Sequence, residues 1–174
     1  MPPLMRDEYE VVPLGRKHDR RAFSCGSETL DRYLHEQASQ DARKRVATVF
    51  VLTEANGDIV IGYYSLASGS VDLGEWPEAL KKKLPLYPVV PVTLLGRLAL
   101  DKKHHGKGLG EYLLMDALWR CSTAAREIAS VAVIVDAIDD KARRFYEHYG
   151  FCAFPKQADR LFLHMQTIQE MFKP

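Results

Sequence analysis

RLALDKKHHGKGLGEYLLMDAL, residues 97–118, decides the fold, because it joins a strand, a glycine loop and a helix without interruption. The apolar run over residues 92–100 predicts the strand, although Gly96 interrupts it. A basic loop with three glycines follows over residues 104–110. Apolar side chains then recur at helical spacing and predict a helix over residues 111–125. This order of elements is typical of a ligand-binding unit in an α/β protein.

The glycine loop has the chemistry of a pyrophosphate cradle. Glycine adopts positive φ easily and lets the backbone approach a ligand closely. A helix N-terminus adds unpaired N–H groups, Lys107 adds a charge, and His104 and His105 add donors. The spacing matches neither the dinucleotide fingerprint nor the P-loop. By itself the pattern therefore leaves a ligand loop and a structural turn as open alternatives.

The rest of the chain reads as alternating strands and helices. We expect strands over residues 9–14, 47–53, 59–67, 131–137 and 160–165, and helices over residues 28–44, 76–84 and 141–149. The strands 47–53 and 59–67 flank a turn at residues 56–58 and predict a hairpin, and either Asp139 or Asp140 can cap the helix that begins at residue 141. The strand 131–137 is apolar throughout, as in a buried parallel pair. Residues 85–91 read as a proline-marked loop. The pattern predicts a single α/β (α+β) domain.

Composition narrows the class of protein. The chain has 174 residues, of which 47% are hydrophobic and 27% charged, and its net charge is +1. This is an ordinary globular mix for one domain, and no apolar run has the roughly 20 residues of a membrane span. Residues 1–16 lack the apolar segment of a secretory signal, so we expect a cytoplasmic protein.

Cysteine and histidine spacing argues against a metal site. Cys25, Cys121 and Cys152 are far apart, and we expect free thiols with a structural role. The four histidines outside the glycine loop show no zinc-ligand spacing, so we expect no metal. Two basic runs, residues 43–45 and 81–83, read either as solvated faces or as contacts to an anionic partner.

Two motifs resemble the Gcn5-related N-acetyltransferases (GNAT). Residues 105–110, HGKGLG, are similar to the family's [Gln/Arg]-x-x-Gly-x-[Gly/Ala] motif, except that His105 replaces Gln or Arg. Residues 142–151, ARRFYEHYGF, resemble its A-x-x-F-Y-x-x-x-G-F segment. The resemblance implies a GNAT domain over residues 1–174, with a mixed central sheet splayed at the acetyl-CoA site and helices on both faces.

The resemblance also implies the residues that carry the chemistry. Tyr146 would be the general acid for the departing thiolate, whereas Tyr149 is assigned to packing. Without the motif, Tyr146 reads as an aromatic core residue beside Phe145. The residues implied to bind acetyl-CoA are Leu98, Ala99, Leu100, His105, Gly106, Lys107, Gly108, Leu109 and Gly110.

A narrower resemblance covers almost the whole chain. FSCG at residues 23–26, GYYSL at 62–66 and LGRLA at 95–99 are similar to the acetyltransferase toxins of bacterial type II toxin–antitoxin systems. That subgroup acetylates aminoacyl-tRNA and blocks translation, which implies a ribbon-helix-helix antitoxin as partner and a homodimer. The residues then expected to contact tRNA are Arg97, Arg43, Lys44, Arg45, Lys81, Lys82 and Lys83.

Other readings remain open at this point. The chain is also compatible with a metabolic or protein N-acetyltransferase, or with a non-catalytic acyl-CoA-binding module. The Arg97 side chain is equally suited to bind a phosphate of the acceptor and to pair with a carboxylate of the protein. An α-amino group has a pKa near 8, and an ester lowers it, so an aminoacyl-tRNA amine needs little help from a base. Asp101 and Asp136 remain base candidates, and a loop cap is the preferred reading of Asp136.

Overall fold

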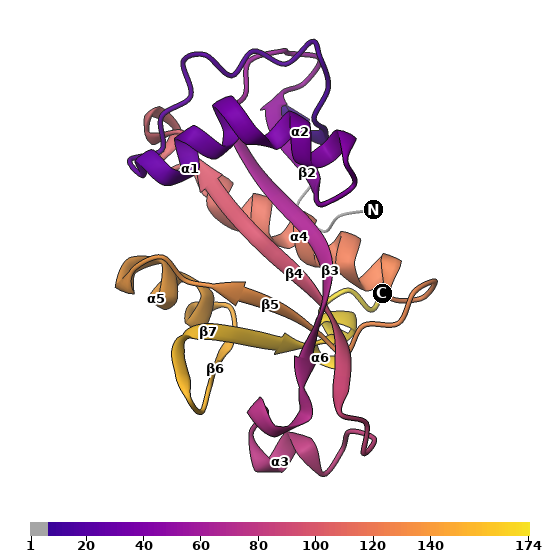
Figure 1. The fold of residues 1–174 in the computed structure, drawn as a ribbon. Helices are drawn as coiled ribbons and strands as arrows, with labels where there is room; N and C mark the ends of the chain where they lie inside the picture. The colour runs from indigo at the N-terminus through magenta and orange to yellow at the C-terminus, as the bar shows by residue number, and fades with distance from the viewer. Residues whose placement is uncertain (1–6) are drawn as a thin grey trace. The chain divides into compact units, whose positions relative to one another are not determined.

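A computed structural model describes residues 7–174, which form two compact units (Figure 1). Unit 1 comprises residues 7–67 and 97–119, and unit 2 comprises residues 68–96 and 120–174. Seven strands hydrogen-bond in the order β1-β2-β3-β4-β5-β7-β6. The sheet is mixed, because β4 pairs with β5 in parallel whereas β1–β2, β2–β3, β5–β7 and β6–β7 are antiparallel. The predicted α/β class with a mixed sheet is confirmed.

Unit 1 begins with the antiparallel pair β1 (Tyr9–Pro13) and β2 (Thr48–Glu54), which continues into the start of β3 (Gly62–Asp72). The end of β4 (Val89–Leu100), the 3-10 turn η3 (Lys102–His104) and most of α4 (Leu109–Ala124) complete it. The predicted hairpin is therefore correct, although β3 starts later than residue 59.

The helix predicted over residues 28–44 has a π-helical turn at its centre. It consists of α1 (Glu28–Arg32), η1 (Tyr33–Gln37) and α2 (Ala38–Arg43). The Ser27 hydroxyl accepts the Leu30 N–H at its start, as an N-cap does. A π turn inserts one extra residue and leaves local carbonyls available for outside donors, and such turns are frequent at functional sites.

Unit 2 contains η2 (Leu73–Glu75), α3 (Glu78–Lys81), β5 (Ala132–Asp136), α5 (Asp140–His148), β6 (Cys152–Phe154), β7 (Gln157–His164) and α6 (Met165–Met171). Figure 1 shows β7 running beside β5, and their register pairs Asp136 with Arg160. The buried strand β5 pairs with β4 in parallel, as its apolar sequence predicted.

Each unit has its own apolar core. In unit 1, Tyr63, Leu34 and Val51 are fully buried within one cluster. In unit 2, Trp76 packs its ring against Phe154 and Phe162, with centroids 5.0 and 5.2 Å away. Aromatic pairs at these separations contribute more than their buried area alone.

Several predicted boundaries are wrong. Residues 89–91 belong to the strand β4 and not to a loop. Proline lacks an N–H but keeps its carbonyl, and the Pro91 carbonyl accepts the Val131 N–H. The helix predicted over 76–84 shrinks to α3. Sequence reasoning also missed the strand β6 and the helix α6. Met165, predicted as the end of a strand, is the first residue of α6.

Cys152 is exposed, contrary to the structural role expected of it. None of the helices described for residues 7–174 is long and apolar enough to cross a membrane.

Gly62 allows three elements of unit 1 to meet. A Cβ built at Gly62 would lie 2.7 Å from Leu113 Cδ1 and 3.0 Å from the Ala99 carbonyl oxygen. Real Cβ atoms essentially never come within 3.0 Å of another atom, and few come as close as 3.0–3.4 Å. A Cβ at this position would therefore require the Leu113 side chain and the Ala99 backbone to move. Gly62 thus brings β3 against the end of β4 and against α4.

We expect Gly62→Ala to destabilise the protein by about 1–3 kcal/mol, because overpacking forces side chains and backbone to shift. Urea unfolding measures this loss. Gly74→Ala is the matched control, because a Cβ there meets nothing within 4 Å. Equal stability of the two variants would show that the close approach at Gly62 carries no constraint.

Candidate active site

A buried carboxylate organises the chain where β4 ends. Asp101 follows the strand and is 7% exposed. Its Oδ2 accepts the Ser24 N–H at 3.0 Å, and its Oδ1 accepts the Lys103 N–H at 2.9 Å. The Asp101 N–H donates to the Ile61 carbonyl at 2.7 Å. Because both carboxylate oxygens already accept backbone donors, Asp101 holds the loop in place and does not resemble a free general base.

The glycine loop has the backbone conformation that its sequence predicted. Gly106 and Gly108 have φ of +80° and +73°, values that side-chain-bearing residues rarely adopt. A Cβ at Gly106 would meet nothing within 4 Å, so the space beside it is open. The His105 ring contacts the Leu100 carbonyl through Nε2 at 3.0 Å, which ties the loop back to the strand.

The helix after the loop starts earlier than predicted, at Leu109 rather than at residue 111. Gly110 therefore lies in the first turn, and Leu109 is fully buried. The Leu109 side chain anchors the helix, while the first-turn N–H groups lack intrahelical partners, as in every helix. With the exposed Lys107 next to it, this end of α4 fits a pyrophosphate by backbone donors and dipole.

At the end of β4, the groups that can contact a ligand belong to the backbone and not to reactive side chains. Ala99 is buried in the unit 1 core, and Leu98 and Leu100 are half-buried. None of these three side chains bears a polar group. Any contact they make to the polar parts of a cofactor must use their N–H and C=O groups.

Arg97, one residue before these three, is held by an aromatic ring. Its guanidinium carbon lies 3.5 Å from the centre of the Tyr33 ring, a cation–π contact. The Tyr33 hydroxyl donates to Asp41 Oδ2 at 2.9 Å. Burial and the hydrogen bond to Asp41 together raise the pKa of Tyr33 to about 12, so the phenol stays protonated. Arg97 is thus positioned by Tyr33 rather than paired directly with a carboxylate.

Tyr146 lies in unit 2, near the end of α5. The helix is capped by Asp139, whose side chain accepts the Ala142 N–H at 2.7 Å, as the sequence predicted. The Tyr146 ring is buried and meets Phe145 and Phe151 edge-on, with centroids 5.3 and 5.4 Å away. Burial raises the pKa of Tyr146 above its usual value, so the phenol is protonated at neutral pH.

Tyr149 differs from Tyr146 in its surroundings. It is half-buried, and its ring contacts Phe145 and His148 edge-on. No described residue between 7 and 174 hydrogen-bonds to the Tyr146 hydroxyl, although that side chain is the more deeply buried of the two. A protonated phenol in these surroundings is a candidate donor to a bound group.

Asp136 is not the loop cap that we expected. Its Oδ1 lies 3.2 Å from Arg160 Nε, on the directly opposite residue of β7. The register of β5 and β7 therefore explains why Asp136 has Arg160 as its partner, since opposite charges on directly paired residues attract. Within residues 7–174, no three His, Cys, Asp or Glu side chains are grouped to hold a metal ion.

The two basic runs lie in different units. Arg43 ends α2, Lys44 caps it, and Arg45 adopts a positive φ of 59°, so all three project from an exposed helix end. In unit 2, Lys81 pairs with Glu78 at 2.9 Å, while Lys82 and Lys83 are exposed.

A family model described as an acetyltransferase (GNAT) domain matches residues 45–153. This chain belongs to the GNAT acetyltransferases. Within that family it is similar to a tRNA-acetylating toxin of Mycobacterium tuberculosis, with 41% identity over 153 residues, or 88% of this chain and 90% of the toxin. The expected fold family and enzyme class are therefore confirmed.

Solved GNAT structures share the whole fold. AtaT complexed with acetyl-methionyl-tRNAfMet superposes with a TM-score of 0.88 at 26% identity, covering 95% of this chain and 100% of that one. AtaTR bound with AcCoA superposes with a TM-score of 0.85 at 26% identity, covering 97% and 100%. The chain therefore has the GNAT fold over nearly its full length.

Sequence reasoning missed two positioning residues of this GNAT enzyme. No positioning role was predicted for Tyr33, because nothing in the local sequence shows that Arg97 lies over its ring. Asp101 was considered as a base, although an Asp just after a strand commonly accepts the N–H two residues on. That local signal was present in the sequence, as the bond to Lys103 shows.

We expect Asp101→Ala to lower the free energy of unfolding by about 1–3 kcal/mol, because it leaves two backbone donors without their acceptor. Acetyl-CoA affinity should fall as well, since Asp101 caps the 3-10 turn that leads into the glycine loop. Thermal melting and calorimetric titration of acetyl-CoA measure the two effects. The exposed Asp159→Ala is the control, and an equal loss there would contradict a specific role for Asp101.

Proposed function

We propose that this chain transfers the acetyl group of acetyl-CoA to the amino group of an aminoacyl-tRNA and so blocks translation. Its similarity to the tRNA-acetylating toxin over nine-tenths of that toxin's length is the observation that carries the proposal. The glycine loop and the buried tyrosine, each predicted from a separate motif, support it. The similar AtaT structures hold the product and the donor of such a reaction, acetyl-methionyl-tRNAfMet in one and AcCoA in the other.

The glycine loop holds the pyrophosphate of acetyl-CoA in this proposal. Backbone N–H groups are the main contribution of His105, Gly106, Lys107, Gly108, Leu109 and Gly110. The positive φ angles of Gly106 and Gly108 and the start of α4 make these groups available. Acetyl-CoA supplies the activated thioester. Backbone groups of Leu98, Ala99 and Leu100 bind the pantetheine and polarise the thioester oxygen, since preorganised N–H donors stabilise a developing oxyanion.

Tyr146 acts as the general acid. The amine attacks the thioester carbonyl, which forms the amide bond and breaks the carbon–sulfur bond, and the departing thiolate takes the phenol proton. The proton that the amine loses passes to solvent, and the Tyr146 phenolate regains a proton from solvent. The raised pKa of Tyr146 keeps that proton in place at neutral pH. Burial weakens the phenol as an acid, but it also raises the basicity of a thiolate in the same apolar surroundings, so transfer remains feasible.

The acceptor amine needs no protein base. An α-amino group next to an ester is largely neutral near pH 7, unlike a lysine side chain. Both oxygens of Asp101 accept backbone donors, and Asp136 faces Arg160, so neither carboxylate is available for the role. This arrangement favours the aminoacyl ester over a lysine side chain as acceptor.

Positive side chains contact the tRNA phosphates. The Arg97 guanidinium lies over the Tyr33 ring and uses its N–H groups to bind an anion. The exposed runs Arg43, Lys44, Arg45 and Lys81, Lys82, Lys83 add contacts whose strength falls with salt. The proposal further includes a ribbon-helix-helix antitoxin as partner, a homodimer, a single domain over residues 1–174 and a cytoplasmic location.

The decisive variant is Tyr146→Phe, which keeps the ring but removes the proton. We expect kcat for acetylation of aminoacyl-tRNA to fall by roughly 10²–10⁴-fold, as for the loss of a general acid, and growth arrest on expression to disappear. Acetylated aminoacyl-tRNA is measured by mass spectrometry, and Tyr149→Phe is the matched control that should keep most activity.

Other outcomes separate the alternatives. A wild-type protein that acetylates small amines or peptides, but not aminoacyl-tRNA, would favour a metabolic or protein N-acetyltransferase. A protein that binds acetyl-CoA without any transfer, and whose effects survive Tyr146→Phe, would favour a non-catalytic binding module.

Replacing a basic run by glutamine tests the tRNA contacts. For Arg43, Lys44 and Arg45, we expect KM for aminoacyl-tRNA to rise while kcat changes little, because these side chains are assigned to binding the tRNA and to no step of the acetyl transfer. The slope of log affinity against log salt should become shallower by about 0.7–0.9 for each lost phosphate contact. The control replaces three other exposed basic residues by glutamine, namely Arg126, Lys156 and Lys173, and removes the same charge. An identical change of slope in this control would contradict a direct contact between residues 43–45 and the tRNA.

A further inference from the structure

A cavity of unit 1 lies outside the residues assigned to acetyl transfer. It has a volume of about 590 Å³, and its lining includes Lys17, His18, Arg20, Arg21, His35 and Asp58. Three basic side chains and two histidines thus surround it, against two carboxylates, Asp19 and Asp58. Both carboxylates already have cationic partners, since Asp19 binds Arg21 at 3.1 Å and Asp58 lies 3.9 Å from Lys17.

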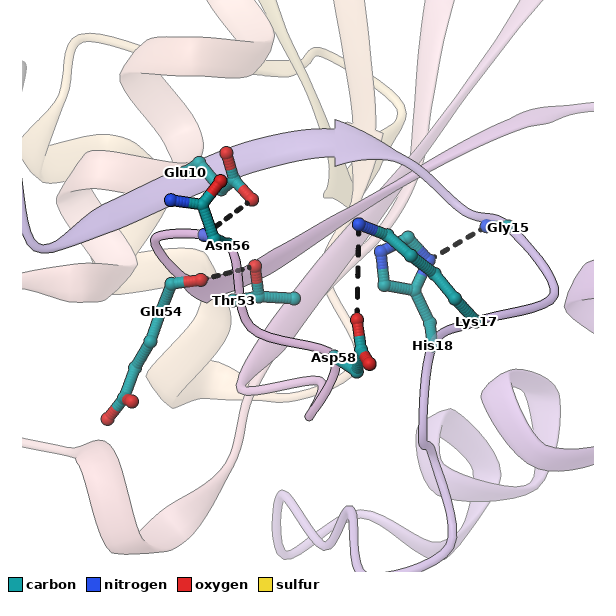
Figure 2. A network of polar contacts seen from close by, with 8 residues as sticks. All are labelled: Glu10, Gly15, Lys17, His18, Thr53, Glu54, Asn56 and Asp58. Atoms are coloured by element: carbon teal, nitrogen blue, oxygen red, sulfur yellow. Dashed lines mark hydrogen bonds and ion pairs between the residues drawn. The ribbon is translucent and has the colours of Figure 1, made fainter.

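His18 provides a buried donor without an acceptor. The side chain is 7% exposed, and its Nδ1 accepts the Gly15 N–H at 2.8 Å (Figure 2). A neutral imidazole whose Nδ1 accepts must carry its proton on Nε2. That Nε2 is buried, and it has no hydrogen-bond partner among residues 7–174. A buried N–H without an acceptor costs free energy, which a bound oxygen would recover.

The tautomer of His18 is stable at neutral pH. Burial lowers the pKa of His18, and the neighbouring Lys17 ammonium lowers it further. The ring is therefore neutral near pH 7 and donates through Nε2 alone. Figure 2 shows the ring next to the Lys17–Asp58 ion pair, so the donor and the ammonium belong to one wall of the cavity.

Arg20 adds a fixed fork of donors. Its Nη1 donates to the Leu34 carbonyl at 3.1 Å and to the Ser39 hydroxyl at 2.8 Å. Leu34 belongs to the π turn η1, so the guanidinium satisfies a carbonyl in that turn. Both acceptors are neutral, and no carboxylate of the described residues pairs with Arg20. Its charge is therefore uncompensated, and its Nε and Nη2 donors remain for a ligand.

We propose that this cavity binds a phosphate group, with the His18 Nε2–H, the Arg20 guanidinium and the Lys17 ammonium as donors. Phosphate oxygens accept several hydrogen bonds at once, and a guanidinium fork matches their geometry. The weakly paired Lys17 is free to exchange Asp58 for a stronger anion. The phosphate comes either from a nucleic-acid backbone or from a free phosphate compound, and the first source rests on the proposed action on tRNA.

The first test titrates inorganic phosphate into ¹⁵N-labelled protein at neutral pH and constant ionic strength. We expect a saturable shift of the His18 Nε2–H resonance and of the Gly15 amide, both followed by ¹H–¹⁵N correlation. Sodium chloride at the same ionic strength is the control. A response no larger than that to chloride would overturn the proposal.

Two variants test the donors. Lys17→Ala and Arg20→Lys should each weaken phosphate binding on the order of tenfold, as for the loss of one charge-assisted contact. Lys156→Ala, an exposed lysine of unit 2, should leave it unchanged. Should Arg20→Lys fail to fold, the exposed Lys17→Ala decides alone, and binding equal to wild type there would overturn the assignment.

Deacylated tRNA without acetyl-CoA identifies the source of the phosphate. Displacement of inorganic phosphate by this tRNA, with a matching shift at His18, assigns the cavity to the nucleic-acid backbone. Saturable phosphate binding that tRNA leaves unaffected assigns it to a free phosphate compound. Acetylation of aminoacyl-tRNA is assayed separately, so that a failure of the proposed function is distinguished from a failure of this inference.

Discussion

The Asp101 carboxylate connects three parts of unit 1 through backbone hydrogen bonds. It accepts the N–H of Ser24, just upstream of the first helix, and the N–H of Lys103, in the turn that leads to the glycine loop. Its own N–H extends the pairing with Ile61 beyond the strand. Hydrogen bonds to an ionised acceptor are about twice as strong as neutral ones, and burial strengthens them further. The start of the glycine loop therefore depends on a residue that performs no chemistry itself.

Aromatic rings hold the polar groups in both units. In unit 1, Tyr63 stacks on Tyr33, which in turn carries Arg97. In unit 2, Phe145 and Phe151 enclose Tyr146 from two sides. Rigid rings position a guanidinium or a phenol with little loss of conformational entropy, because few rotatable bonds have to be ordered. Apolar surroundings also keep Tyr146 protonated, so the same packing that orders the residue maintains its acid form.

A net charge of +1 conceals the local electrostatics of this GNAT enzyme. Arg97 on its tyrosine and Arg20 on the π turn are both cations bound to neutral groups. By contrast, Arg143 and Arg160 are neutralised by carboxylates on the same helix or the adjacent strand. The net charge of the chain therefore says little about anion binding. Whether a given cation can bind an anion depends on whether a carboxylate already neutralises it.

Local sequence determined the elements whose signals lie within a few residues. The glycine loop, the Asp139 cap, the buried parallel strand and the GNAT motifs were all predicted, because φ preferences, capping and apolar runs are short-range effects. The short α3, the pairing of β6 with β7 and the stacking of Arg97 on Tyr33 were decided by tertiary structure. Each of these depends on residues that are distant in sequence or on a packing surface that no local pattern encodes. The unpaired donor of His18 is of the same kind, since an imidazole lacks an acceptor only relative to the neighbours that folding places around it.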